Sequence, residues 1–219
     1  MYVVECYCKF NAIGWCEMLV SIITPCSRPL NLPTIYWSIL NMNTDDVEWI
    51  IVYDGDVVDK RILQYQDRVS IKLFNKIPDN NDLRGTRCNK LRNIGIENAI
   101  GNYLYFLDDD NIVHPKLYDR ICRYKDEWNS KILVFNQYSP KFNERILRLD
   151  ESCVKEGVLD TAQFVVPRIY KTRWTINQIN YYEEIDYFKN LMNEAGNDNI
   201  IWINRLYTFR NYLRFGGIL

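Results

Sequence analysis

Short strand-like runs alternate with helical segments over the first 138 residues, and this alternation constrains the fold more than any other feature. The runs are rich in β-branched and aromatic residues, and we predict buried strands at 19–24, 48–53, 69–74, 102–107 and 131–137. Helical segments are predicted between them at 30–42, 57–66, 87–100 and 115–128. Strands separated by helices form βαβ units, so the sequence predicts an α/β fold with a mostly parallel central sheet flanked by helices.

After residue 138 the alternation degrades, which indicates a smaller, irregular region. Short strands are predicted, the first two of them antiparallel at a sheet edge, at 146–149, 163–167 and 200–203. The amphipathic segment 181–195 is predicted as a helix closed by Gly196, as Gly101 is expected to close the helix at 87–100. The aromatic, basic tail 205–215 is interpreted as a surface helix. No linker or repeat divides the chain, so we expect a single domain over 1–219.

Composition argues against several classes of protein. With 47% hydrophobic and 14% aromatic residues, the 219-residue chain can bury a substantial core. A net charge of −1 argues against sequence-independent binding to nucleic acid. No apolar run reaches the roughly 20 residues that a bilayer-spanning helix needs. We therefore expect neither a nucleic-acid partner nor a transmembrane segment.

Cysteine usage predicts a reducing compartment, and hence a cytoplasmic protein. The seven cysteines are odd in number and scattered without a disulfide framework. Residues 1–18 are apolar but interrupted by charges and lack a basic start, which is typical of mature protein rather than a signal peptide. The single histidine, His114, excludes a multi-histidine metal site within the chain and is interpreted as structural.

The predicted strand at 102–107 ends in three consecutive acids, Asp108, Asp109 and Asp110. Adjacent carboxylates repel one another, and they are tolerated where a divalent cation lies between them. Ligands of open α/β sheets bind beyond the carboxyl ends of the strands. The sequence therefore predicts a metal-assisted site for a phosphate-bearing ligand; the alternative is a solvated turn whose acids cap the next helix.

Two other predicted strands also end in polar residues. Thr-Pro-Cys-Ser-Arg at 24–28 follows the first strand and Asp54 ends the second, while Arg92 lies on the helix that leads into the fourth strand behind a basic run at 84–90. The carboxyl ends of parallel strands share one edge of a sheet. Acids beside Arg and Lys suit a nucleoside diphosphate, because cations neutralise its phosphates and a carboxylate binds ribose or base.

A helix, a turn and a strand end carry a recognisable signature. They are Arg-Asn-Ile-Gly at 92–95, Ala-Ile-Gly at 99–101 and Phe-Leu-Asp-Asp-Asp at 106–110. At this spacing they resemble the Arg-Asn-x-Gly helix, Ala-x-Gly turn and Asp-x-Asp strand end of family 2 glycosyltransferases of the GT-A fold. Residues 23–25 and 49–54 fit the first two strands of that family.

A second similarity is to the glucuronosyltransferases of family 43. The matching segments are Thr24-Pro25, Arg28-Pro29, Arg84-Gly85, Asp108 to Asn111, Asp160 to Phe164 and Glu184. The match departs at Gln163, where that family has glycine, and in the wider spacing between Arg84 and Arg92.

These resemblances imply a fold and an activity. The expected fold is Rossmann-like GT-A, with a nucleotide-binding half at about 19–111 and an acceptor-side half at about 112–219. The implied reaction is an inverting transfer of a sugar from a nucleotide-sugar, with UDP the expected carrier, to a hydroxyl acceptor. Mn²⁺ or Mg²⁺ is the implied cofactor.

The resemblance also implies roles for the matching residues. Donor contacts are expected from Thr24, Pro25, Arg28 and Arg84, with Asp54 on the base, Arg92 on the nucleotide and Asp160 on sugar hydroxyls. Asp110 would bind the metal directly. Asp108 would contact ribose, or the metal through water. Asp109 would face the donor sugar or nearby backbone.

Three acids at the start of the predicted helix at 181–195 compete for the role of catalytic base. An inverting transfer needs one carboxylate to take the proton of the acceptor hydroxyl. At about 100° per residue, Glu183 and Asp186 point in similar directions and Glu184 points elsewhere. Glu184, which the resemblance favours, ranks first, then Glu183, then Asp186.

Two other functions fit parts of the sequence. A sugar-1-phosphate nucleotidyltransferase uses a similar sheet but needs a glycine-rich loop after the first strand, and residues 25–29 contain no glycine. A non-catalytic module that binds nucleotide-sugars is the other alternative. Trp174 is expected to pack rather than to bind an acceptor. The tail residues Asn204, Arg205 and Arg210 either close over the diphosphate or lie on a surface helix, and the surface helix is the preferred interpretation.

Overall fold

The computed structural model describes residues 5–6, 20–79, 84–124, 130–139, 144–145, 150–154, 159–176 and 183–215. Its strands are β1 (Glu5–Cys6), β2 (Val20–Cys26), β3 (Val47–Asp54), β4 (Ser70–Lys76), β5 (Tyr103–Phe106), β6 (Ile112–Val113), β7 (Ile132–Ser139), β8 (Glu144–Arg145), β9 (Phe164–Pro167) and β10 (Ile200–Phe209). Its α-helices are α1 (Leu32–Leu40), α2 (Arg84–Asn98), α3 (Leu117–Cys122), α4 (Glu183–Ala195) and α5 (Tyr212–Phe215).

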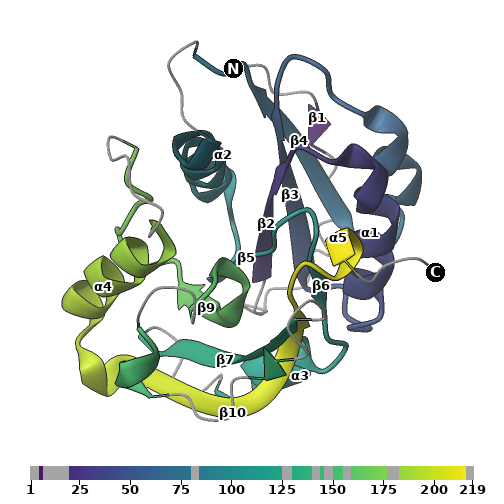
Figure 1. Cartoon of the computed structure of the whole chain (residues 1–219). Coiled ribbons are helices and arrows are strands. Elements are labelled where there is room, and N and C mark those ends of the chain that lie inside the picture. Colours follow the sequence, from purple (N-terminus) through teal and green to yellow (C-terminus); the bar gives the residue numbers. More distant parts are fainter. Residues whose placement is uncertain are drawn as a thin grey trace.

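Within the described residues the strands form one mixed sheet in the order β1-β4-β3-β2-β5-β9-β7-β10-β6, with β8 beside β7. β4, β3, β2 and β5 are mutually parallel, and β7 and β10 are parallel to each other. β9 runs antiparallel to both β5 and β7 and joins the two groups. Figure 1 shows β2–β4 upright with β7 and β10 crossing below them, so the sheet is strongly bent. The predicted α/β class with a mostly parallel sheet is confirmed.

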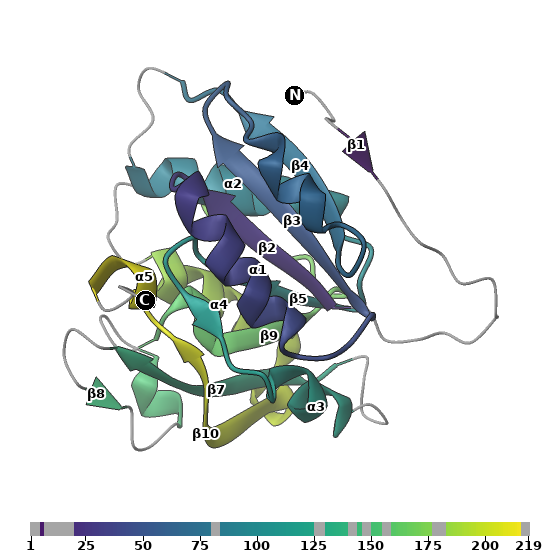
Figure 2. The same ribbon diagram turned by 90° about the vertical axis from the view of Figure 1, so that its right-hand side faces the viewer.

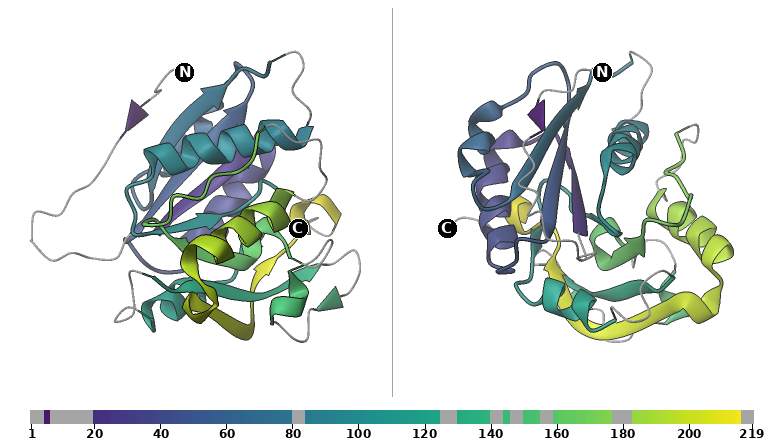
Figure 3. Two further views of the ribbon diagram at one scale, coloured as in Figure 1. Left: turned by 90° about the vertical axis from the view of Figure 1, so that its left-hand side faces the viewer. Right: turned by 180° about the vertical axis from the view of Figure 1, so that it is seen from behind.

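Helices cover both faces of the sheet. α1 and α3 pack on one face, as seen for α1 in front of β2–β4 in Figure 2. α2 and α4 pack on the opposite face, as shown in Figure 3. Because both faces are covered, neighbouring residues of β3 enter different cores: Ile51 faces α1, Ile50 and Val52 face α2, and all three are fully buried. This explains the continuous apolar runs that predict these strands.

Gly95 allows α2 to lie directly against the sheet. A Cβ atom at this position would lie 2.3 Å from the side chain of Ile23 on β2. Real atoms do not approach so closely, so only glycine permits this contact between helix and strand. The glycine of the Arg-Asn-Ile-Gly sequence therefore fixes how near α2 comes to the end of β2, and it places Arg92 one turn earlier on the same helix.

The front half of the chain, up to about residue 138, follows the sequence prediction with small changes. The predicted strands correspond to β2, β3, β4, β5 and β7, and a proline lies in the first turn of α1 as expected. The segment 57–66 forms a 3-10 helix at Lys60–Tyr65 rather than an α-helix. The prediction that Gly101 closes α2 is wrong: the helix ends at Asn98, and the amide of Gly101 donates to Ser21 and Glu48 instead.

The back half of the chain, after about residue 138, departs further from the prediction. The strand at 163–167 is antiparallel as expected, but β9 lies inside the sheet between β5 and β7, not at an edge. The predicted short strand at 200–203 continues to Phe209, and the expected tail helix is reduced to Tyr212–Phe215. Bulges near Leu206 disturb the two-residue period of β10, and this concealed the strand in the sequence.

Two features of the back half complete the comparison. The helix closed by Gly196 is confirmed, with the glycine at φ 79° after α4. The predicted strand at 146–149 lies outside the described residues, as do 125–129 and 181–182. Among the helices that the structure describes, none has the length and apolar character required to cross a membrane.

Candidate active site

Three polar strand ends meet at the carboxyl edge of the parallel strands. Ser27 and Arg28 follow β2, Asp54 ends β3, and Asp108 to Asp110 follow β5. Backbone and side-chain atoms of Ser27 and Arg28 contact Asp109, which joins the β2 and β5 ends directly. The convergence predicted from the sequence is therefore present, and ligands of open α/β sheets bind at such an edge.

Asp108 is held between two elements. Its carboxylate accepts a hydrogen bond at 2.9 Å from the Arg92 guanidinium of α2 and one at 3.2 Å from the Thr161 hydroxyl. About 28% of its side chain remains exposed, so this acid stays accessible to a ligand. Asp108 therefore joins α2 to the segment before β9.

Arg92 is a buried cation at the centre of the site, with 3% of its surface exposed. Besides Asp108 it donates to the side chain of Asn89 at 3.1 Å, and its guanidinium lies 4.5 Å from the ring centre of Trp174. Trp174 in turn stacks on Tyr187 of α4 with 4.2 Å between ring centres. The expected packing role of Trp174 is consistent with its burial, and the stack holds the arginine in place.

Asn93, the next residue of the motif, forms hydrogen bonds with the backbone of Trp174. Its amide group donates to the Trp174 carbonyl at 2.8 Å and accepts from the Trp174 amide at 2.9 Å. This pair of bonds imitates the pairing between two strands. The Arg-Asn sequence therefore works as a unit, because Asn93 fixes the tryptophan on which the Arg92 guanidinium rests.

Asp109 binds nearby backbone, one of the two alternatives that the sequence left open. One carboxylate oxygen accepts from the amides of Ser27 at 2.6 Å and Arg28 at 2.7 Å, and the other contacts the Arg28 guanidinium. Its backbone carbonyl accepts from Asn31 at 2.8 Å. Asp109 is 4% exposed and its oxygens are engaged, so it orders the loop between β2 and α1.

The carboxylate of Asp110 is also buried, but it has fewer hydrogen-bond and ion-pair partners than that of Asp109. One of its oxygens lies 3.0 Å from the Arg28 guanidinium, and the described residues offer no partner to the other. Burial raises the pKa of Asp110 to about 6, and the negative charge of Asp108 adds to this while Arg28 opposes it. The raised pKa means that burial and the neighbouring acids together outweigh the attraction of Arg28.

Asp160 and Arg210 bring the back half of the chain into the site. Asp160 caps the 3-10 turn Thr161–Gln163 and lies 2.8 Å from the Arg210 guanidinium. Burial raises the pKa of Asp160, and Arg210 opposes this. The sequence did not predict the contact between Arg210 and Asp160, because the strand that precedes Arg210 was predicted to stop at residue 203. Arg210 directly follows β10 only in the structure, so the sequence offered no local signal for it.

The chain beyond β10 also contacts the acid loop. The amide of Asn211 donates to the Asn111 side chain at 2.7 Å, and the amide of Leu213 donates to the Asp110 carbonyl at 3.0 Å. Residues separated by about a hundred positions in the sequence thus form one wall of the site, which no local pattern predicts.

The three candidate bases differ in their surroundings. Burial raises the pKa of Glu184 to about 7, with Arg92 opposing the shift and Asp160 adding to it. Burial also raises the pKa of Glu183, where again Arg92 opposes and Asp186 adds. The charges of Arg92, Asp160 and Asp108 all act on Glu184, whereas of these three only that of Arg92 acts appreciably on Glu183. A carboxyl group with a pKa near 7 suits general base catalysis at neutral pH.

The remaining predicted contacts lie farther from this centre. The carboxylate of Asp54 is 3.7 Å from the Arg87 guanidinium of α2 and stays partly exposed. Thr24 is fully buried, and its hydroxyl accepts from the indole of Trp49 at 2.9 Å, so its side chain serves the core. Pro25 lies within β2. Arg84 begins α2, and its side chain lies outside the described part of the structure.

The acids at the β5 end have the donor chemistry of a divalent-cation site. Asp108 and Asp110 offer hard carboxylate oxygens, which Mg²⁺ and Mn²⁺ prefer, and burial together with the charge of Asp108 raises the pKa of Asp110 despite Arg28. The described residues contain no group of three or more ligating side chains around one point. Mg²⁺ is commonly held by one or two carboxylates plus phosphate and water, so the pair fits that mode of binding.

Solved structures with the same fold were found by structural comparison. The chain superposes on S. aureus TarS with a TM-score of 0.66 at 15% identity, covering 88% of this chain and 36% of that one. TarS 1–349 in complex with UDP-GlcNAc gives 0.65 at 14% identity, covering 88% and 58%. The mannosyltransferase PcManGT from Pyrobaculum calidifontis, in complex with GDP-Man and Mn²⁺, gives 0.65 at 11% identity, covering 90% and 58%.

The chain thus spans between 36% and 60% of the length of the TarS structures, which contain further residues. No curated protein matches the sequence significantly. The model of the family described as "Glycosyl transferase family 2" matches residues 21–213, which include the strand ends and the acid loop. This match covers nearly all of the described sheet, and the chain therefore belongs to glycosyl transferase family 2.

Proposed function

We propose that this protein transfers a sugar from a nucleotide-sugar donor to a hydroxyl group of an acceptor. The observation that carries the proposal is the charge of the site. Six carboxyl groups interact with three guanidinium groups: Asp109 and Asp110 with Arg28, Asp108, Glu183 and Glu184 with Arg92, and Asp160 with Arg210. This excess of negative charge does not suit a bare diphosphate, and it does suit a diphosphate that arrives with a divalent cation.

The donor would lie along the carboxyl ends of β2, β3 and β5. Asp54 would accept from the base, and Asp108 would accept from ribose hydroxyls or reach the cation through water. Arg92 fixes Asp108, and Arg28 lies close enough to Asp110 to contact a phosphate oxygen. Asp160 would bind sugar hydroxyls, with Arg210 holding its carboxylate in place.

Asp110 and Asp108 would hold Mn²⁺ or Mg²⁺. When bound, such an ion acts as a Lewis acid that stabilises the departing nucleoside diphosphate. The Mn²⁺ and GDP-Man in the PcManGT structure support this assignment, and the UDP-GlcNAc complex of TarS 1–349 supports a UDP-sugar. The sequence similarity to family 43 likewise makes UDP-sugars the first donors to test.

Glu184 would act as the catalytic base. Its carboxylate takes the proton of the acceptor hydroxyl as that oxygen attacks the anomeric carbon, and this direct attack inverts the configuration. A pKa of about 7 leaves a substantial deprotonated fraction at neutral pH and makes the carboxylate basic enough to accept the proton. Trp174 and Tyr187 are buried and stacked on each other beside Arg92, whose charge opposes the rise in the pKa of Glu184.

The test is donor turnover with defined metals. The protein is incubated with UDP-GlcNAc, UDP-glucuronic acid or GDP-mannose in Mn²⁺, Mg²⁺ or EDTA, and the released nucleoside diphosphate is measured. We expect release with one donor in metal and none in EDTA. Asp110→Asn should abolish release, while Asp45→Asn, an exposed acid far from the site, should leave it unchanged.

Other outcomes would contradict the proposal. Release that persists in EDTA and in Asp110→Asn would remove the metal from the mechanism. Formation of nucleoside triphosphate from a nucleotide-sugar and pyrophosphate would identify a nucleotidyltransferase. Binding of a nucleotide-sugar without turnover in any metal, with or without sugar acceptors, would indicate a non-catalytic module.

A further inference from the structure

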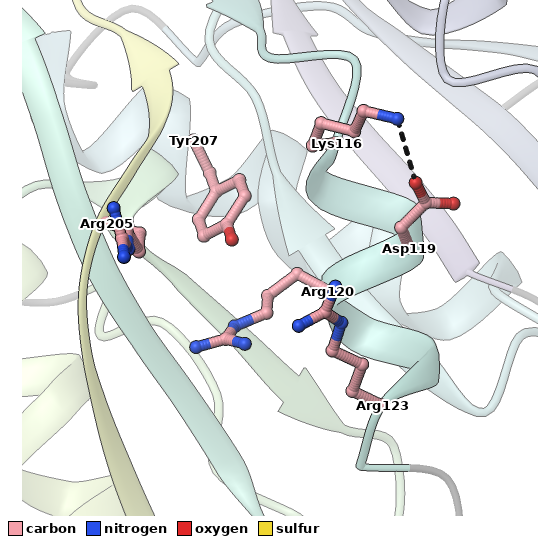
Figure 4. A pocket seen from close by; sticks show the side chains of 6 residues that line it. All are labelled: Lys116, Asp119, Arg120, Arg123, Arg205 and Tyr207. Carbon is pink, nitrogen blue, oxygen red and sulfur yellow. Dashed lines mark hydrogen bonds and ion pairs between the residues drawn. The ribbon is translucent and has the colours of Figure 1, made fainter.

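A basic hollow lies between α3 and β10, away from the candidate active site. Its volume is about 390 Å³, and it is lined by Lys116, Asp119, Arg120, Arg123, Arg205 and Tyr207 (Figure 4). Tyr207 belongs to the core on the α1 and α3 face of the sheet, whereas α2 and α4, which carry Arg92 and Glu184, cover the other face. Four cations and one acid line the hollow in a chain whose net charge is −1.

The arginines come from two separate elements and converge. Arg120 on α3 and Arg123 just after it extend toward the ring of Tyr207, and Arg205 approaches from β10 (Figure 4). Arg123 and Arg205 are exposed and Arg120 is half-buried, so water screens part of the repulsion among the three charges, and an anion bound between them would screen it further. Lys116 is different, because it pairs with Asp119 at 3.4 Å at the rim.

In the described residues the Arg120 guanidinium lies 5.6 Å from the ring centre of Tyr124, a cation–π contact that leaves its charge unpaired. Within that part of the chain no carboxylate pairs with Arg120, Arg123 or Arg205, and the Nε atom of Arg120 is buried with no hydrogen-bond partner. A buried donor that makes no hydrogen bond carries a free-energy cost, which a ligand oxygen can remove. The arrangement is therefore better matched to a bound anion than to the empty state.

The donors fit phosphate in particular. Guanidinium groups present paired N–H donors that match phosphate oxygens, and the Tyr207 hydroxyl adds one further donor. We propose that this hollow binds the phosphate group of a ligand, supplied either by a soluble phosphate compound or by the headgroup of a phospholipid. Because the lining of the hollow includes none of the residues proposed to bind the donor, the hollow would hold a second ligand that takes no part in donor chemistry.

Two binding measurements on the full chain in EDTA test this site and separate the two sources. Titration with inorganic phosphate and with inorganic pyrophosphate, followed by calorimetry, reports soluble anions. Co-sedimentation with vesicles of phosphatidylcholine alone, or mixed with phosphatidic acid, reports headgroups. The variants are Arg123→Gln, Arg205→Gln and the triple change that adds Arg120→Gln. The matched control is Arg68→Gln, an exposed arginine that lies outside the hollow.

We expect the wild type and Arg68→Gln to bind at least one probe equally well. Each single change should weaken binding by about tenfold, as expected for a lost charged hydrogen bond, and the triple change should abolish it. Loss of phosphate binding identifies a soluble ligand, and loss of vesicle binding alone identifies a lipid headgroup. Binding that survives the triple change, or the absence of binding to every probe, would overturn the proposal. Thermal melts confirm that the single variants, both at exposed positions, remain folded.

Discussion

Buried carboxylates lie at both ends of the parallel strands, but their negative charge is compensated at one end and only partly compensated at the other. At the amino end, Glu48 of β3 is fully buried, and its carboxylate lies 2.7 Å from the Lys72 ammonium of β4. It also accepts from the Ser21 hydroxyl and from the amides of Ile100, at 2.7 Å, and Gly101, at 3.2 Å. This acid joins three strands to the end of α2, and its charge is compensated within the fold.

At the carboxyl end, compensation is incomplete. Asp110 and Glu184 have pKa values raised to about 6 and about 7, because burial and neighbouring acids outweigh the nearby arginines. The same chemical group thus has two uses. A compensated carboxylate fixes the fold, whereas an undercompensated one, with its raised pKa, remains available to a cation or a proton, at some cost to stability. Four predictions test this difference.

The largest expected effect is on activity. Glu184→Gln should lower kcat about 10²- to 10⁴-fold, the contribution typical of a general base. Its free energy of unfolding should stay the same or rise, because the change removes a buried charge. Steady-state kinetics and urea unfolding measure the two effects. Asp186→Asn on the same helix is the control; an equal loss of kcat in that variant would show that the wrong acid has been assigned.

The opposite pattern is expected at the amino end. Glu48→Gln should lower the free energy of unfolding by about 3–5 kcal/mol, because it leaves Lys72 buried without its partner. Activity per folded molecule should remain. Urea unfolding of Glu48→Gln, Lys72→Met and the double variant measures the coupling, and the double variant should cost less than the sum of the single changes. Purely additive costs would mean that the pair is not coupled.

Gly95→Ala links the fold to the site. The added methyl group would meet Ile23, so we expect a loss of about 1–3 kcal/mol in the free energy of unfolding, as for other overpacked cores. Because Arg92 lies one turn away on α2, kcat should fall as well. Glu97→Ala, an exposed site on the same helix, is the control. Unchanged stability in Gly95→Ala would show that α2 shifts freely against β2.

The smallest effect concerns pH. The pKa of Glu184 is raised from 4.5 to about 7 in the folded state, so between these values the folded protein binds more protons than the unfolded chain. Stability should therefore rise as pH falls from about 7 toward 4.5, by an amount on the order of 1–2 kcal/mol. The pH dependence of kcat should be opposite: kcat should rise as the pH increases through 7, because the base loses its proton.

Urea unfolding at several pH values, without metal, measures this slope. Glu184→Gln should flatten it, although the part due to Asp110 remains. A slope that is the same in the wild type and in Glu184→Gln would show that Glu184 is not the group whose pKa is raised.

Much of the front half could be predicted because its signals are local. Strands covered on both faces are continuous apolar runs, and the polar residues that end them must share one edge of a parallel sheet. The back half could not be predicted in the same way. β9 enters the sheet between strands from distant parts of the chain, and the bulges of β10 remove the alternation by which a strand is recognised.

The sequence alone determined the α/β class, the family motifs and the acids at the β5 end, because each depends on neighbouring residues. Only the tertiary structure decided the different interactions of those acids. Asp109 orders the loop that carries Arg28, and Asp108 pairs with Arg92. The negative charge of Asp110 remains only partly compensated. The tertiary structure also decided that Arg210 meets Asp160 and that three arginines meet beside Tyr207. Such contacts depend on how distant segments pack, and charge compensation is a property of that packing.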